Sequence, residues 1–439
     1  MGPLTIAASL FVLMLALMAV RIPIAVAMFV AGLAGYLALA GWLPAMSHLK
    51  TYTYARFSSY DLSVIPLFLL MGQFATQGGL SRALFRFGAT VLGRFRGGLA
   101  MAAVLACAAF GSVCGSSVAT AATIGSVALP EMRRHGYSGR LATATVAAGG
   151  TLGILIPPSV VLVVYAILTE QNIAKLFAAA FIPGLIAMLG YLVAIGLYVR
   201  LVPGQAPEHD AVDRAALWSS VAGVLPVLAI FLIVFGGIYG GVFTPTEGAA
   251  VGAAATFLTA LVRGELDRAK VMQAFYGTAE ASAMIFMIFL GADMLNSALA
   301  LSQAPNQLAG AVSALSLPPM AVIVLILVFY VLLGCVMDEL SMILLTVPIF
   351  FPLVMGLDLG LAPDEQAIWF GILILMVVEI GLIAPPVGLN VYVINGIDRQ
   401  TPIGESYRGV VPFLISDVIR TALLLAFPAL SLTLVRAMN

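Results

Sequence analysis

The chain has 439 residues, of which 62% are apolar and only 9% are charged. An ordinary soluble domain carries roughly 25% charged residues, and a soluble fold could not bury this much apolar surface. Lipid must therefore cover part of the molecule. The net charge of zero gives no reason to expect a nucleic-acid partner. The three cysteines lie inside apolar runs, so they indicate neither a disulfide framework nor a zinc site.

Ten stretches of the chain are apolar enough to cross a membrane as helices, which takes roughly 20 residues each. They are residues 4–20, 22–41, 61–78, 141–168, 176–199, 221–242, 247–262, 280–301, 366–396 and 412–435. The first stretch lacks the basic start and the cleavage site of a signal peptide, so we expect a retained helix. The sequence thus predicts an all-α polytopic membrane protein.

Two further apolar runs, 98–129 and 318–357, are too long for one span and are interrupted near their centres. Arginines lie on both sides of the run 98–129, and short loops rich in arginine stay on the cytoplasmic side. This run must then enter and leave the membrane from the same face. We therefore predict two re-entrant hairpins, the first from the cytoplasm and the second from outside.

The distribution of basic residues sets the orientation. If the spans alternate from an external N-terminus, fifteen basic residues lie in cytoplasmic segments and four in external ones. Such a bias is a strong orientation signal. The sequence therefore places the N-terminus outside the cytoplasm.

The two halves of the chain repeat one motif, because Gly-Ile-Leu-Ile-Pro-Pro at 153–158 returns as Gly-Leu-Ile-Ala-Pro-Pro at 381–386. Each half holds five spans and one hairpin, so the second half runs opposite to the first. The first half, 1–215, has its hairpin near 98–129 and a broken helix at 141–168. The second half, 216–439, has its hairpin near 318–357 and a broken helix at 366–396. Inverted repeats with matching broken elements are typical of secondary transporters.

Each break exposes oxygen atoms that suit an alkali cation. Proline has no backbone N–H and disturbs the carbonyl four residues earlier, which frees the carbonyls of Gly153 and Gly381. Hydroxyl groups at the first hairpin tip add further oxygen ligands. The predicted cation-binding residues are Ser116, Ser117, Gly153, Pro157, Asp338, Gly381 and Pro385. We expect substrate between the tips, at Gly115, Thr120, Pro158, Pro386 and Asn390.

Three acids within the apolar runs stand out, because a charge at the membrane centre costs about 2.5–3.5 kcal/mol on insertion scales. Asp338 is at the second hairpin tip and is a cation-site candidate. Glu379 is a candidate for a cation or a proton, and Asp293 is undecided between a functional and a structural role. Thr244-Pro-Thr-Glu247 has the pattern of a helix capping box.

Several of these motifs resemble one known family. They are Gly115-Ser-Ser-Val-Ala-Thr120, Gly149-Gly-Thr-Leu-Gly-Ile-Leu-Ile-Pro-Pro158, Thr244-Pro-Thr-Glu247 and Glu379-Ile-Gly-Leu-Ile-Ala-Pro-Pro-Val-Gly388. In this order they resemble the large membrane subunit of tripartite ATP-independent periplasmic (TRAP) transporters, the DctM-like family, and the likeness runs from about residue 20 to about 415. Ala384 departs from the family, which commonly has threonine there, so any ligand from that hydroxyl is missing.

The resemblance implies an elevator-type permease in a bacterial inner membrane, with a periplasmic N-terminus. It implies coupling to Na⁺, no covalent cofactor, and import of an organic acid. The implied partners are a periplasmic substrate-binding protein and a small four-helix membrane subunit, which we expect to be a separate chain.

Two other readings remain. One is a stand-alone cation-coupled exchanger for ions or organic anions with the same fold, using Asp338 and Glu379. The other is an intramembrane aspartyl protease using Asp61 and Asp293, which needs two acids at close range and does not account for the repeat. No catalytic residue is therefore predicted.

Overall fold

The computed structural model describes residues 2–207, 217–304, 307, 310 and 317–438. The predicted boundary between the two halves, at 215 and 216, lies outside these residues. The described chain is helical almost throughout, as the sequence predicts. Six of its helices are long and apolar enough to cross a membrane, or eight if two bent helix pairs each count as one span.

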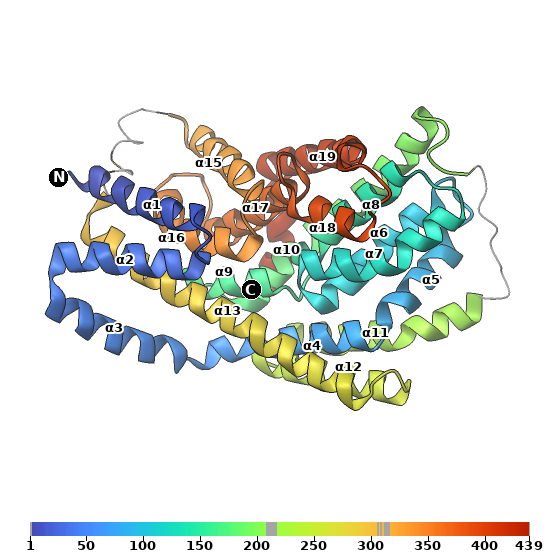
Figure 1. Cartoon of the computed structure of the whole chain (residues 1–439), viewed down its shortest axis with the longest axis horizontal. Coiled ribbons are helices and arrows are strands. Elements are labelled where there is room, and N and C mark those ends of the chain that lie inside the picture. The colour runs from blue at the N-terminus through green and yellow to red at the C-terminus, as the bar shows by residue number, and fades with distance from the viewer. Residues whose placement is uncertain (1, 208–216, 305–306, 308–309, 311–316, 439) are drawn as a thin grey trace.

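One group of helices forms an outer frame along one edge of the molecule (Figure 1). It consists of α1 (Pro3–Ala19), α2 (Ile24–Ala40), α3 (Trp42–Phe57), α4 (Val64–Gln77), α11 (Leu217–Tyr239), α12 (Pro245–Val262) and α13 (Arg268–Leu301). The tightest contact joins α2 to α13: a Cβ added to Gly32 would lie 2.4 Å from the backbone nitrogen of Leu295. Small residues at such crossings let two helices approach closely in lipid.

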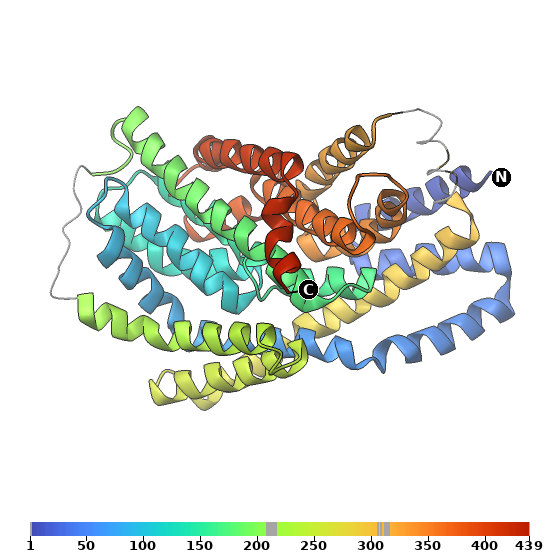
Figure 2. The ribbon, with the colours of Figure 1, turned by 180° about the vertical axis from the view of Figure 1, so that it is seen from behind.

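A second group, here called the core group, holds the hairpins and the broken helices (Figures 1 and 2). Its members are α6 (Gly98–Cys114), α7 (Ser117–Arg134), α8 (Gly139–Leu155), α9 (Val160–Thr169), α10 (Ile173–Leu201), α15 (Pro319–Gly334), α16 (Glu339–Met355), α17 (Pro363–Ile383), α18 (Leu389–Ile397), α19 (Ile403–Ala426) and α20 (Ala429–Ala437). The most apolar stretch of α17 is completely buried, so this helix lies at the centre. Helix α5 (Leu80–Leu92) contacts both α11 of the frame and α6 of the core.

The two predicted hairpins are present as helix–turn–helix pairs. The run 98–129 forms α6 and α7, which turn at Gly115 and Ser116, and the run 318–357 forms α15 and α16. The two broken helices are also present. Helices α8 and α9 meet at an angle of 40°, and the peptide bonds Pro157–Pro158 and Pro385–Pro386 are both cis. The glycine and proline residues that interrupt the apolar runs therefore predict the positions of both hairpins and both broken helices.

Other elements differ from the sequence prediction. Residues 42–57, expected in an external loop, form α3, which exposes Trp42 and Tyr54. Aromatic side chains of this kind are enriched where a membrane meets water, so a hydropathy threshold for spanning helices misses such a helix. The expected span 412–435 is divided into α19 and α20 at Phe427 and Pro428, where proline supplies no backbone N–H to continue the helical hydrogen bonds.

The capping box at the start of α12 is confirmed. Glu247 donates its backbone N–H to the Thr244 hydroxyl at 3.2 Å, and its carboxylate accepts from the Thr244 backbone N–H at 2.8 Å. Asp293 forms a salt bridge of 2.7 Å with Arg56, which ties α13 to α3. This motif and this acid therefore have structural partners within the frame.

The predicted hairpin topology can be tested by labelling. Arg96 precedes α6 and His135 ends α7, so single cysteines at these positions mark the two outer ends of the first hairpin. Both should react with an impermeant thiol reagent from the cytoplasmic side only. Cys107, Cys114 and Cys335 are buried, so the background should be low. Labelling of the two positions from opposite faces would contradict the hairpin.

Candidate functional site

The first hairpin tip packs directly against the first broken helix. A Cβ added to Gly111 would lie 2.4 Å from the Cα of Gly153, and one added to Gly153 would lie 2.7 Å from the Thr120 hydroxyl oxygen. Gly115 has a φ of +66°, which favours glycine at the turn. Ser116 then caps α7 through its side chain. The predicted meeting of Ser116 and Thr120 with Gly153 is therefore present.

The second hairpin tip repeats this contact in the other half. A Cβ added to Gly381 would lie 2.5 Å from the Cα of Gly334. The backbone N–H of Gly388, after the break, donates to the carbonyl of Cys335 at 3.4 Å. Only glycine allows two backbones to approach this closely. Both halves therefore join a hairpin tip to a broken helix by the same glycine-to-glycine contact.

The end of each broken segment leaves a carbonyl facing a proline. The last helical backbone hydrogen bonds of α8 and α17 are accepted by the carbonyls of Leu152 and Ile380. The carbonyls one residue further along, those of Gly153 and Gly381, would normally accept the backbone N–H four residues later. Those positions are Pro157 and Pro385, which have no N–H. These two carbonyl oxygens are the ones that the sequence predicts to be free.

The two tips also meet each other. Asn390, at the start of α18, donates to the Ser117 hydroxyl at 2.6 Å and to the carbonyl of Ala147 at 3.1 Å. Glu339, the first residue of α16, lies against the backbone N–H of Ser117. Asn390 and Ser117 are predicted site residues from different halves. The structure therefore brings both tips to one place near the centre of the core group.

Several oxygen atoms at this meeting point have no hydrogen-bond partner among the described residues. They are the hydroxyl oxygens of Thr120 and Ser341, Oδ1 of Asn390 and Oε2 of Glu339. All four side chains are buried. A buried acceptor without a partner is costly unless a ligand satisfies it. Hydroxyl, amide, carboxylate and freed carbonyl oxygens together form a donor set for a hard cation.

Asp338 and Glu339 have different roles at the second tip. The Asp338 carboxylate accepts the backbone N–H of Ser341 at 3.0 Å and caps α16. Its assignment to a cation stays a prediction, because capping alone accounts for an acid at this position. Glu339 is the acid that faces the first tip, and the sequence analysis missed it. The sequence signal for Glu339 was its position directly after the residue that caps α16, because the first turn of α16 points into the site.

The two breaks differ in their access to solvent. Pro157 and Pro158 are buried, whereas Pro385 and Pro386 are exposed. The Tyr407 hydroxyl of α19 donates to the carbonyls of Pro386 and Val387 at 3.0 and 2.6 Å. The second proline break is therefore exposed at the surface of the molecule, and the first is not.

Further contacts between the halves lie beyond the second break. Arg133, near the end of α7, donates to Asp398 and Gln400 in the loop after α18. Burial opposes the charge on Asp398, but the hydrogen bonds from Arg133 and Thr401 and the positive charge of Arg133 hold the pKa of Asp398 below its usual value. This ion pair joins the base of the first hairpin to the second half.

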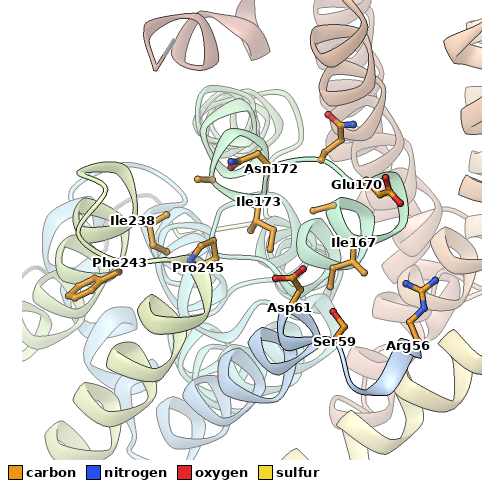
Figure 3. A pocket seen from close by; sticks show the side chains of 13 residues that line it. Arg56, Ser59, Asp61, Ile167, Glu170, Asn172, Ile173, Ile238, Phe243 and Pro245 are labelled. Atoms are coloured by element: carbon orange, nitrogen blue, oxygen red, sulfur yellow. The ribbon is translucent and has the colours of Figure 1, made fainter. Parts of the chain in front are cut away.

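A separate polar pocket of about 550 Å³ lies between the two helix groups (Figure 3). Its lining includes Asp61 from the short helix before α4, Glu170 and Asn172 between α9 and α10, Phe243 before α12, and Pro245 at the start of α12. Frame and core both contribute to this pocket. It is distinct from the central site, which the hairpin tips enclose.

Two hairpin tips that enclose buried oxygen atoms beside two broken helices define the architecture of a secondary transporter. A family model for the DctM component of tripartite ATP-independent periplasmic transporters matches residues 11–430. The chain belongs to this family, and it is therefore a multi-pass membrane transport protein and no enzyme.

Individual relatives agree with this membership. The chain is 37% identical over 376 residues to the C4-dicarboxylate TRAP transporter large permease protein DctM of Pseudomonas aeruginosa, covering 85% of this chain and 86% of that protein. It is 32% identical to the protein of the same name from Vibrio cholerae, covering 90% of both. The solved YdaH transporter of Alcanivorax borkumensis shares the fold, with a TM-score of 0.61 and 16% identity over 88% of each chain.

The glycine contacts provide a direct mutational test. Gly153→Ala and Gly381→Ala should each lower the free energy of unfolding by about 1–3 kcal/mol, because the added methyl overpacks backbone. Both should also lose transport, since the tips cannot seat on their helices. Thermal unfolding of the purified variants and uptake by proteoliposomes measure the two effects.

Gly396→Ala in α18 is the matched control, because nothing lies within 4 Å of a Cβ at that helical position. It should keep transport and leave the unfolding midpoint unchanged or slightly raised. Equal behaviour of all three variants would contradict the account of the tip contacts.

Proposed function

We propose that the chain is the large permease subunit of a sodium-coupled symporter that imports an organic acid. The observation that supports this most is the set of buried, unpartnered oxygen atoms where the two hairpin tips meet. A buried polar atom without a partner is costly in a membrane core, and a bound cation would offset that cost. The coupling ion would hold each tip against its broken helix.

Sodium fits the donor set better than other metals do. No group of three or more His, Cys, Asp or Glu side chains suited to a metal ion occurs in the described residues. The candidate ligands are instead hydroxyl, amide and carbonyl oxygens, with Glu339 as the one acid that faces the first tip. Ser116, Ser117, Gly153 and Pro157 would surround one ion, and Gly381, Pro385 and Asp338 or Glu339 a second.

An anionic substrate would bind between the two tips. Helices α7 and α16 begin at the tips, and α9 and α18 begin just after the breaks. The N-terminus of a helix carries a partial positive charge and free N–H groups, which bind anions. Gly115, Thr120, Pro158, Pro386 and Asn390 are the proposed contacts. C4-dicarboxylates are the substrates to test first, because both relatives described above carry that name.

The two helix groups suit an elevator mechanism. The core group would carry substrate past the frame group, and the polar pocket between them would change its volume in each cycle. The exposed Pro385–Pro386 break faces the cytoplasm in the predicted topology, so this arrangement would be the one that releases substrate inside. Surrounding lipid would support the frame.

The proposed partners follow from the family, whose name describes a three-part system. A periplasmic substrate-binding protein would deliver the organic acid, and a small four-helix membrane subunit would pack against the permease. The complex would lie in a bacterial inner membrane with the N-terminus of this chain in the periplasm.

The alternative is a stand-alone cation-coupled exchanger with the same fold. It would move substrate without a binding protein, and it would use the buried acids as its ion site. Reconstitution of the permease with and without its binding protein separates the two proposals. Uptake that is equal in both preparations would favour the exchanger.

Substitutions at Glu339 and Ser117 test the sodium site. Glu339→Gln should raise the half-saturating Na⁺ concentration by about tenfold or more, because losing a charged partner costs roughly 1.5–3 kcal/mol. Ser117→Leu should act in the same direction by filling the meeting point. Sodium-dependent uptake by proteoliposomes containing the complete complex measures both effects.

Asp338→Asn is the matched control, because asparagine caps a helix as well as aspartate does. If Asp338 only caps α16, this variant keeps the sodium response of the unaltered protein. A sodium response unchanged in all three variants, at normal expression, would overturn the proposed site. A shift in Asp338→Asn alone would assign the cation to Asp338.

A further inference from the structure

An apolar groove of about 710 Å³ lies on the frame group, where α3 packs beside α2 and α13. Figure 1 shows α3 at the outer edge of the frame. Phe29 of α2, Leu290 of α13, and Leu49 and Phe57 of α3 form the apolar walls of the groove. The proposed sodium and substrate contacts all lie in the core group. The groove therefore needs its own explanation.

A single positive charge stands at the edge of this groove. Among the described residues that line it, only Lys50 is charged, and Lys50 has no hydrogen-bond or ion-pair partner in the described part of the chain. The other cation of α3, Arg56, is neutralised by Asp293 through two hydrogen bonds of 2.7 Å. Lys50 thus places an uncompensated charge beside an apolar surface.

Polar and apolar groups follow one another along one face of α3. Lys50, Thr53 and Phe57 are spaced by three and four residues, which places them on the same side of a helix. The Thr53 hydroxyl is buried and has no partner among the described residues. Ser58 donates its hydroxyl back to Ala55 at 3.3 Å. From Lys50 to Phe57, over about 10 Å, the face therefore presents a cation, a free hydroxyl and an aromatic ring.

We propose that this groove binds an anionic glycerophospholipid of the surrounding membrane. Such a lipid carries its phosphate, its ester carbonyls and its acyl chains in the same order as the groups on α3. The phosphate pairs with Lys50, an ester carbonyl accepts from the Thr53 hydroxyl, and one acyl chain covers Phe57 and Leu290. The amine of a zwitterionic headgroup would find no carboxylate in the described lining, so the groove favours a headgroup with a net negative charge.

The apolar surface continues beyond the groove, as an acyl chain requires. The ring of Phe286 on α13 lies 5.9 Å from that of Phe57, centroid to centroid, and Met287 beside it is exposed. A soluble anion would leave this surface uncovered, and a wholly apolar partner helix would leave Lys50 without a counter-ion. The exposed aromatic residues of α3 are typical of the boundary between membrane and water, where lipid phosphates lie. The bound lipid would brace α3 against α2 and α13.

Photo-cross-linking in vesicles of equal amounts of phosphatidylglycerol and phosphatidylcholine tests this proposal. p-Benzoylphenylalanine in place of Phe57 puts a photoreactive ketone in the groove, and mass spectrometry of the cross-linked peptide identifies the captured lipid. Phosphatidylglycerol should exceed phosphatidylcholine by about fivefold, the selectivity that one lysine gives for an anionic lipid. The excess should disappear in Lys50→Gln. Glycerol phosphate in solution should not reduce it, because that anion has no acyl chain.

Lys175→Gln is the matched control. Lys175 lines a polar pocket with Glu170 and Asp364 and not an apolar groove, so loss of its charge should leave the excess unchanged. Equal capture of the two lipids would overturn the proposal, as would the absence of a lipid adduct or an excess that persists in Lys50→Gln. Competition by glycerol phosphate would assign a soluble anion instead, and capture of the small membrane subunit in the complete complex would assign a protein partner.

A second measurement decides if the variant at residue 57 fails to fold. Native mass spectrometry of the chain with Phe57 in place, titrated with each lipid in detergent, should give phosphatidylglycerol the higher affinity. Lys50→Gln should lower that affinity about fivefold, to the level of phosphatidylcholine. An unchanged affinity in Lys50→Gln would contradict the proposal. None of the residues involved belongs to the proposed ion or substrate sites, so this outcome would leave the proposed function as it stands.

Discussion

The close approach of backbone to backbone at Gly111–Gly153 and Gly334–Gly381 is the contact on which the site depends. Lipid cannot satisfy the polar groups of a broken helix or a hairpin turn, so both must be buried against protein. Glycine removes the side chains that would hold the two backbones apart. Each tip can then lie against a break, and the polar groups of both elements collect in one place.

This packing concentrates oxygen atoms and helix N-termini at the centre of the core group. Hydroxyl and carbonyl oxygens attract a cation, and the N-termini attract an anion. The same small region therefore favours the binding of a cation and an anion together. That combination is what a cation-coupled carrier of organic anions requires. The frame group supplies the separate surface against which the core group could move.

Local sequence patterns account for most of the fold. Glycine, proline and the arginine clusters predict both hairpins, both broken helices and the capping box, because each feature depends on neighbours in the chain. Helix α3 is missed because its composition is polar and aromatic. The division of α19 from α20 at Pro428 shows that an apolar run does not define a continuous helix.

The site is only partly predictable for a different reason. Ser117, Gly153 and Asn390 follow from the motifs, but the hydrogen bond between Asn390 and Ser117 joins residues 273 positions apart. The same holds for Glu379 and Arg420, which are 41 positions apart and on different helices. At the second tip, two adjacent acids have different environments, and only packing decides that Glu339 faces the first tip. Long-range contacts of this kind leave no local pattern.

Thermal unfolding of the purified protein in sodium or potassium, at equal ionic strength, tests the central claim most directly. A ligand that binds the folded state raises its stability, so sodium should raise the unfolding midpoint and potassium should not. A C4-dicarboxylate should raise the midpoint further only in sodium, because each ligand must strengthen the binding of the other by the same factor. Equal midpoints in the two salts, with and without dicarboxylate, would contradict an ion-held pair of tips.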